Sequence, residues 1–358
     1  MKINFRNRKS RGVALIMVMI AVAVFTALAA ALAFSMKVET KLARTADDEQ
    51  QLLWLGRSGV EYARWILSQH PVSERYDSLN QIWAGGPGSA GETNSALTGI
   101  SMTDYPVGDG TISIKIIDLE RKVNVNTANS VELQQVLTVM GVNADDISVV
   151  SDSILDWRDT DDAPHVAGAE SDYYQGLNPP YYAKNAPFDN LAELLLVKGV
   201  TPEMYWGISA TNHTPGTFQK PKLGFGTAPG ETPDYPFGLV DIFTPFSSGQ
   251  INVNTADANV LQTIPGMDAT TAESIIKYRS GPDGAEATED DTPFQSVGQL
   301  NAAGISPAVV QQLGRYCTVN SSTFEVHVTA KAGDTTREYT AILYRNGTDI
   351  QVVSFWWK

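Results

Sequence analysis

The chain has one cysteine and only four histidines among its 358 residues. A lone Cys317 excludes an intrachain disulfide, a Cys-x-x-Cys redox pair and a zinc site built from several cysteines. Neither the nucleophile pattern Gly-x-Ser-x-Gly nor the phosphate-binding pattern Gly-x-x-x-x-Gly-Lys-Ser/Thr occurs. The sequence therefore contains none of these catalytic motifs, and we expect a protein that is not an enzyme.

Positive charge is also scarce, because 26 Lys and Arg residues stand against 40 Asp and Glu, a net charge of −14. Nonspecific nucleic-acid binders depend on basic side chains that displace counterions, so bulk DNA binding is disfavoured. The exception is residues 1–12, with five basic side chains and no acid. Residues 13–358 are consequently five units more negative than the whole chain, so the two parts are suited to different environments.

Charge is absent from Val13 to Phe34, a run of 22 residues in which Thr26 supplies the only hydroxyl. As a helix the run would span about 33 Å, enough for a hydrocarbon core of about 30 Å. We predict a transmembrane segment at 13–35, with a cytoplasmic N-terminus on the basic side and the acidic body on the other. A cleaved signal peptide is the alternative, but the run is long and contains neither Pro nor Gly.

The helical pattern continues beyond the apolar run, so we predict one helix from Val13 to His70 that Pro71 ends. Its second half carries an apolar stripe with spacings of three and four residues, which places the side chains on one face. We assign this stripe to partner binding, or to packing under a sheet of the same chain. Its members are Leu52, Leu55, Gly59, Tyr62 and Ile66.

Arg11, Gly12 and Val13, followed by the unbroken apolar helix, resemble the leader of type IV pilins and pseudopilins. The resemblance implies cleavage by a prepilin peptidase after Gly12 and N-methylation of Val13. It also implies a glutamate fifth in the mature chain, where this sequence has Met17. A subunit with no neighbour ahead of it in a filament could dispense with that carboxylate, which is costly in a membrane, so a tip position is implied.

Alternating apolar and polar residues predict a small antiparallel sheet. Ile112, Ile114 and Ile116 mark one strand, after a Gly-, Ser- and Thr-rich stretch at 84–110 that we expect to be loop. Three more strands are predicted near the C-terminus, joined by turns at 332–334 and 346–347. The predicted strands are 111–117, 323–330, 335–344 and 349–355.

An internal repeat separates these strands. Residues 123–128 (Val-Asn-Val-Asn-Thr-Ala) recur at 251–256, and the Pro-Phe segment at 187–194 recurs at 293–300. The first copy is longer by about 22 residues, around 159–186. We predict an α+β fold in which a pilin-like long helix lies on the sheet, with a large helical insertion of two helix-hairpin-helix-like (SAM-like) repeats. The predicted boundaries are a leader at 1–12, a frame at 36–121 and 321–358, and an insertion at 122–320, divided into repeat 1 (about 122–210), linker (about 211–249) and repeat 2 (about 250–320).

The second copy resembles the helix-hairpin-helix unit of DNA-uptake receptors. That unit needs small residues and nearby basic side chains so that backbone N–H groups can approach a phosphate. Here Gly266 is followed by Met267 and Asp268, and no basic residue occurs until Lys277. We therefore expect the fold to be retained and DNA binding to be lost.

The first copy contains an acidic segment, within residues 156–170, that could supply oxygen ligands to a hard cation such as calcium. The spacing of its acids is not that of an EF-hand. The alternative is a solvated loop in which Arg158 pairs locally. We expect His165 to be a loop residue rather than a general base, and Trp157 and Tyr173 to pack the loop. The candidate metal ligands are Asp156, Asp159, Asp161, Asp162 and Glu170.

The phrase at 156–162, the two Asn-x-Asn-Thr-Ala motifs, the segment at 188–194 and the leader without its glutamate together resemble the minor pseudopilin K family of type II secretion systems. The resemblance implies calcium binding by the periplasmic domain and a place at the pseudopilus tip, where the protein helps to initiate and limit assembly for protein export across the outer membrane. It implies as partners the other minor pseudopilins, the major pseudopilus subunit, prepilin peptidase and the bacterial inner membrane, with no nucleic acid. Alternatives are a minor pilin of a type IV pilus and a membrane-anchored helix-hairpin-helix DNA-binding protein.

Overall fold

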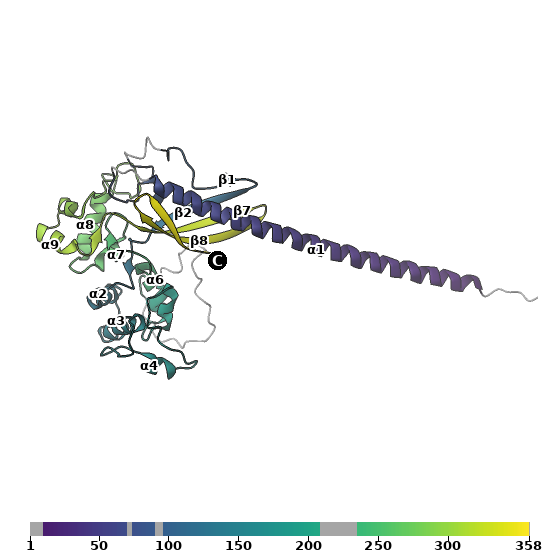
Figure 1. Cartoon of the computed structure of the whole chain (residues 1–358), viewed down its shortest axis with the longest axis horizontal. Coiled ribbons are helices and arrows are strands. Elements are labelled where there is room, and N and C mark those ends of the chain that lie inside the picture. Colours follow the sequence, from purple (N-terminus) through teal and green to yellow (C-terminus); the bar gives the residue numbers. More distant parts are fainter. Residues whose placement is uncertain (1–9, 70–73, 90–95, 208–234, 358) are drawn as a thin grey trace, which may run out of the picture.

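A computed structural model describes residues 10–69, 74–89, 96–207 and 235–357. One long helix projects from a head that consists of a helix-on-sheet frame and a mostly helical insertion beside it (Figure 1). The two parts of the head have separate apolar cores, one within residues 52–116 and 324–350, the other within 123–319. The predicted fold class is confirmed.

The long helix α1 runs from Ser10 to Ser68, 59 residues that extend about 88 Å at the usual helical rise. Its side chains from 13 to 43 are all exposed, and this part leaves the head as a bare rod (Figure 1). Within the described residues α1 is long and apolar enough to cross a membrane. The helix ends two residues before the predicted His70, which lies with Pro71 outside the described residues.

The frame sheet is antiparallel throughout and has the order β1-β2-β7-β8-β9. The predicted alternation holds, since Ile112, Ile114 and Ile116 are all buried under α1. The stretch 84–110 is not entirely loop as predicted, because it includes a three-residue edge strand paired with β2. The strands are β1 (Tyr105–Val107), β2 (Gly110–Asp118), β7 (Thr323–Ala332), β8 (Thr335–Asn346) and β9 (Asp349–Trp357), and a short 3-10 helix η1 (Ile82–Ala84) precedes them.

The apolar stripe of α1 packs against this sheet. Leu52, Leu55 and Ile66 are almost fully buried in the frame core. At Gly59 a Cβ would lie 2.3 Å from Val328 Cγ1, so only glycine permits this approach. The assignment of the stripe to a separate partner is therefore wrong, because the chain's own sheet covers it. Tyr62 is half-buried, and its hydroxyl donates to the Ser101 carbonyl (3.3 Å).

The insertion is built from short helices and two small parallel strand pairs, β3 with β4 and β5 with β6. Its elements are β3 (Val123–Asn124), α2 (Ser130–Val139), α3 (Ala144–Arg158), α4 (Ser171–Gln175), η2 (Leu191–Leu196), α5 (Pro202–Trp206), α6 (Leu239–Ile242), β4 (Phe243–Thr244), β5 (Ile251–Asn252), α7 (Ala258–Gln262), α8 (Ala269–Arg279), η4 (Val297–Ala303), α9 (Pro307–Leu313) and β6 (Cys317–Thr318). Most of the predicted linker lies outside the described residues.

The repeated sequence landmarks meet in space. In the second copy, the Asn254 amide donates to the Phe294 carbonyl (2.9 Å) and accepts from the Phe294 N–H (2.8 Å). In the first copy, Asn126 makes the same two bonds with Phe188, at 3.0 and 2.7 Å. Each Asn therefore replaces a missing strand partner for the Phe backbone, which explains why the two landmarks recur together.

The last residue of the second helix in each copy is an arginine that points back to the Asn-x-Asn motif. Arg158 donates to the carbonyls of Val125 and Ala128, and Arg279 donates to the carbonyl of Val253 (2.6 Å). Arg158 thus closes its repeat through the main chain, which differs from the local pairing with acids considered above.

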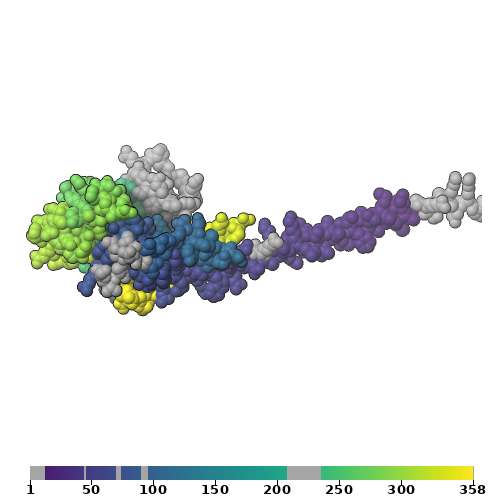
Figure 2. Space-filling model, turned by 90° about the horizontal axis from the view of Figure 1, so that it is seen from above, coloured from purple at the N-terminus to yellow at the C-terminus, as the bar shows by residue number. Residues whose placement is uncertain are grey.

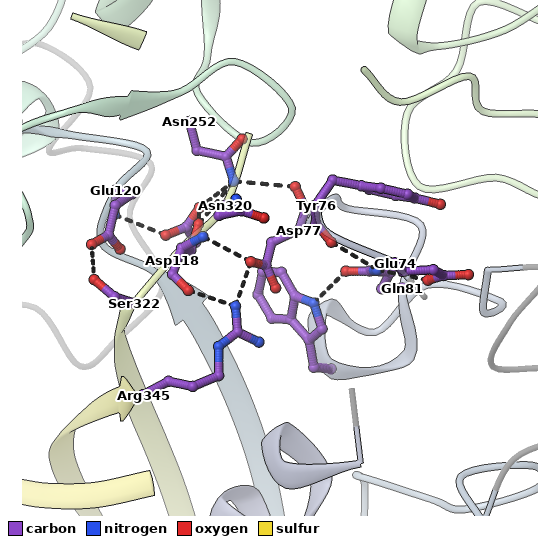
Figure 3. Close-up of polar contacts among 12 residues, drawn as sticks. Glu74, Tyr76, Asp77, Gln81, Asp118, Glu120, Asn252, Asn320, Ser322 and Arg345 are labelled. Atoms are coloured by element: carbon purple, nitrogen blue, oxygen red, sulfur yellow. Dashed lines mark hydrogen bonds and ion pairs between the residues drawn. The ribbon is translucent and has the colours of Figure 1, made fainter. Parts of the chain in front are cut away.

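A buried polar cluster joins the insertion to the frame (Figure 3). The Asn252 amide donates to the Asp77 carbonyl (3.1 Å), to Asp118 Oδ2 (3.2 Å) and to Ser321 Oγ (2.8 Å). Arg345 pairs with the carboxylate of Asp77. The second copy is therefore fixed to the frame by side chains from distant parts of the sequence.

Candidate metal centre

The acidic loop, residues 159–170, connects α3 to α4. Asp156, on the last turn of α3, lies beneath this loop. The Asp156 side chain is fully buried, and its Oδ1 accepts from the main-chain N–H of His165 at 3.0 Å. A Cβ on Gly168 would lie 1.8 Å from Asp156 Oδ2, so the loop can pass this carboxylate only with glycine there. The loop is thus wrapped around a buried acid.

The loop and Asp156 contain two overlapping groups of potential metal ligands. Asp159, Asp161 and Glu170 each offer an oxygen within 4.8 Å of the others, and Asp159 also groups with Asp156 and His165 within the same limit. Oxygens that surround one calcium ion at about 2.4 Å lie no more than about 5 Å apart, so this spacing fits a shared cation.

Glu170 provides the strongest indication of a ligand. Its side chain is 5% exposed, and both carboxylate oxygens lack a hydrogen-bond partner among the described residues. Burial raises the pKa of Glu170 to about 7, and the negative charges of Asp156 and Asp159 add to the effect. A buried carboxylate without partners is costly unless a cation compensates it, so the residues present fit a hard divalent ion.

Two side chains from later segments hold the loop. The Lys198 ammonium donates to the carbonyls of Ala167 (3.1 Å) and Gly168 (2.9 Å). The Asn185 amide donates to the carbonyl of Asp161 (3.0 Å) and to Asp162 Oδ1 (3.1 Å). Of the five predicted ligands, Asp162 is therefore the one that the structure does not bring into either group.

His165 is the residue that sequence reasoning missed. Its Nδ1 lies against Asp156 Oδ1, and this hydrogen bond raises the pKa of His165. The nine-residue separation from Asp156 gives no helical or strand period, so the sequence offered no signal beyond a histidine among acids. The predicted packing roles fare differently: Trp157 is buried against Tyr174, whereas Tyr173 is 43% exposed beneath the Lys198 ammonium.

The hairpin of the second copy carries an acid at the start of its second helix. Gly266 has a φ of +89°, as a tight turn requires, and Asp268 caps α8 by accepting from the Thr271 N–H at 2.7 Å. Hydrogen bonds from the Thr271 hydroxyl first, and from the Thr271 N–H second, lower the pKa of Asp268, so a negative charge stands at the helix start where a phosphate would bind. The corresponding helix of the first copy, α3, has Asp145 and Asp146 in its first turn.

The predicted processing site lies at the edge of the described residues. Gly12 and Val13 belong to α1, and the Val13 side chain is 52% exposed. The rest of the predicted leader, residues 1–9, lies outside the described part of the chain. Cleavage after Gly12 stays a prediction.

Two family models match the head. The model described as type II secretion system, protein K, matches residues 114–209, which include the acidic loop. The model described as a helix-hairpin-helix motif matches residues 247–318, which include the whole second copy. The two matches cover most of the insertion and correspond to its two copies.

Several relatives carry a similar description. Type II secretion system protein K of Aeromonas hydrophila is 25% identical over 224 residues, 55% of this chain. The match covers 61% of that relative's length. The protein K of Pseudomonas aeruginosa is 25% identical over 303 residues, 80% of this chain and 77% of the relative.

A solved structure shares the fold. One chain in the crystal structure of the GspK–GspI–GspJ complex from the type 2 secretion system of enterotoxigenic Escherichia coli superposes with a TM-score of 0.61 at 20% identity, covering 88% of this chain and 99% of that one. Family model, relatives and fold agree, so the resemblance predicted from the sequence is confirmed.

Proposed function

We propose that this chain, a member of the type II secretion system protein K family, is a minor pseudopilin at the tip of the pseudopilus. There it helps to initiate and limit assembly of the filament that exports proteins across the outer membrane. The GspI and GspJ proteins of the solved complex indicate the kind of partner it has, namely other minor pseudopilins.

The exposed half of α1 is the single observation that carries the proposal. Every described side chain from residue 13 to 43 is exposed, including Phe25 and Phe34 at 70%. Such a surface needs lipid or other apolar helices around it. A helix of this kind can lie in the inner membrane before assembly and in a helical bundle afterwards, with the head on the periplasmic side.

The width of the head supports the tip position. In Figure 1 the first copy, with α2, α3 and α4, lies to the side of the frame, and the second copy, with α8 and α9, lies beyond the end of the frame opposite the exposed part of α1. Neighbours stacked directly above would therefore meet the insertion. Met17 replaces the carboxylate that would otherwise pair with a subunit ahead. Processing after Gly12 by prepilin peptidase, with methylation of Val13, belongs to the same proposal, as does contact with the major subunit.

A pull-down of the full-length chain from detergent-solubilised inner membranes tests the assignment. We expect the other minor pseudopilins of the same secretion system to co-purify with it. Labelled chain should then be found at one end of purified pseudopili. Labels repeated along the shaft, or a mature chain free in the periplasm without α1, would contradict the proposal.

We further propose that the acidic loop binds calcium. Asp159, Asp161 and Glu170 would hold the ion, and Asp156 would position the loop through His165. The unpartnered carboxylate of Glu170 supports a bound cation, and the all-oxygen character of this trio favours calcium over softer metals. Bound calcium would supply charge compensation that stiffens the first copy.

The helix-hairpin-helix match supports a second candidate function, that of a membrane-anchored DNA-binding protein. Asp268 weighs against it, because its carboxylate caps the helix start that would meet a phosphate. A minor pilin of a type IV pilus is the remaining alternative. Genes for the other secretion components beside this one would favour the pseudopilus, and pilus genes would favour the alternative.

A further inference from the structure

The two edges of the frame sheet are protected very differently. β1 has only three residues, and its central residue is Pro106, which has no N–H to offer to another strand. β9 has nine residues, and its side chains from Ile350 to Trp357 carry no charge. Stable proteins usually guard an exposed edge with charges, proline, brevity or a bulge. β1 is short and contains a proline, whereas β9 has only Asp349 at its start and one bulge.

The side chains of β9 are also unusually apolar for a surface. Val352 and Val353 are 41% and 58% exposed, and Trp356 and Trp357 are 37% and 61% exposed. Pairing with β8 passes from Ser354 to Val352 across a bulge, which leaves Val353 unopposed. The bulge bends the edge but leaves both valines in solvent. The last residues of the chain, yellow in Figure 2, reach the surface of the head near α1.

A hollow of about 350 Å³ lies beside this strand, between the insertion and the outer face of the sheet. Phe246, Tyr344 and Val353 give it apolar walls. An occupant with apolar side chains would suit these walls.

We propose that β9 is a docking edge to which a different, less acidic pseudopilin adds an extended strand. The inference deepens the function proposed above and rests on it. An extended strand is the occupant that can pair with the edge of β9 that no other described strand occupies, while its side chains cover the valines and tryptophans. A second copy of this chain is disfavoured, because a net charge of −14 on each would repel.

The test uses the full-length chain, solubilised from membranes that also contain the other minor pseudopilins. The Val352→Lys and Val353→Lys double variant should retain about tenfold less of one partner, because lysine places a charge on the covered edge. Val131→Lys is the matched control, since Val131 is 62% exposed on α2, in the insertion. It should retain partners as wild type does, and both variants should melt near the wild-type temperature.

A photo-crosslinking residue at Val353 identifies the occupant. Crosslinks to a strand of another pseudopilin support the proposal, whereas crosslinks to a second copy, to lipid or to nothing overturn it. Full partner retention by the double lysine variant would also overturn it. In each of these cases wild type still assembles if the proposed function is correct, and failure of wild type to assemble would instead refute that function.

Discussion

The two copies of the insertion have the same internal skeleton and different loops. In both, an Asn side chain holds a Phe backbone, and an arginine at the end of the second helix closes onto the motif. Both loops that follow are rich in acids. One acid of the first loop, Glu170, nevertheless differs from the paired acids of the second loop.

In the second copy the chain itself satisfies the acids. Asp290 accepts from the Thr288 hydroxyl (2.8 Å) and the Asp283 N–H (3.0 Å), and Glu286 pairs with Arg279. In the first copy Glu170 is buried with neither oxygen bonded among the described residues. The comparison teaches that burial without partners, rather than the number of acids, identifies a candidate cation site.

The largest effect is expected from the shared Asn. Asn254→Ala should lower the free energy of unfolding by about 3 kcal/mol, because it leaves a buried N–H and a buried carbonyl of Phe294 unpaired. Asn126→Ala should cost about half as much, because Asn126 is only partly buried and water can replace it. Chemical unfolding of the purified chain in detergent measures both. Equal losses would show that burial does not distinguish the copies.

The second largest effect is expected from calcium, which should stabilise the chain through the loop of the first copy and not through that of the second. Calcium at roughly thirty times its dissociation constant should stabilise the wild-type chain by about 2 kcal/mol. Glu170→Gln should abolish this gain, and it should raise stability in calcium-free buffer because a buried charge is removed. Asp290→Asn, in the other loop, should keep the gain. If calcium left the melting temperature of the wild-type chain unchanged, the proposed calcium site would be refuted.

The junction between the frame and the second copy gives a pH dependence through Asp118, the last residue of β2. Burial, with repulsion from Glu120, raises the pKa of Asp118 to about 8. A raised carboxyl pKa stabilises the folded state while the group is protonated. That contribution is complete below about pH 4, the ordinary value, and is lost as pH rises towards 8.

The melting temperature of the wild-type chain should fall between pH 5 and 8, and Asp118→Asn should make this fall less steep. The exposed Asp109→Asn is the control and should leave the slope unchanged. An unchanged slope in Asp118→Asn would mean that the Asp118 carboxyl stays ionised in the folded chain, held by its bonds from Thr255 and Ser321.

The smallest effect concerns DNA. In a gel-shift with duplex DNA at low salt, we expect no band from the wild-type chain. Asp268→Gly restores a Gly-x-Gly hairpin, yet it should also give none, because the first basic residue of α8 is Lys277. A salt-sensitive shift that appears in the variant would show that Asp268 alone silences the hairpin, and a shift in wild type would favour the DNA-binding alternative.

Sequence patterns anticipated much of the fold. The uncharged run predicted the exposed half of α1, and alternation predicted four strands to within a few residues. The edge strand β1 was missed, because Tyr105–Val107 is too short to show a period. The stripe of α1 was correctly placed on one face, but a pattern of apolar residues does not say whether the covering surface belongs to the same chain.

The candidate site was anticipated less completely. Counting acids selected Asp159, Asp161 and Glu170 correctly as neighbours, and also Asp162, whose carboxylate instead accepts from Asn185. His165 was not selected, because only the path of the loop brings it to Asp156.

By itself, the sequence determined where apolar surface had to be hidden, since periodicity and charge act between residues close in the chain. That local information was enough for the rod, the strands and the duplicated insertion. Tertiary structure alone decided which surfaces meet: the sheet that covers Leu52, the Asn252 amide that reaches Asp118, and the place of β9 at the edge of the described sheet. These pairings join residues far apart in sequence, and their free energies depend on burial and partners that exist only after the chain has folded.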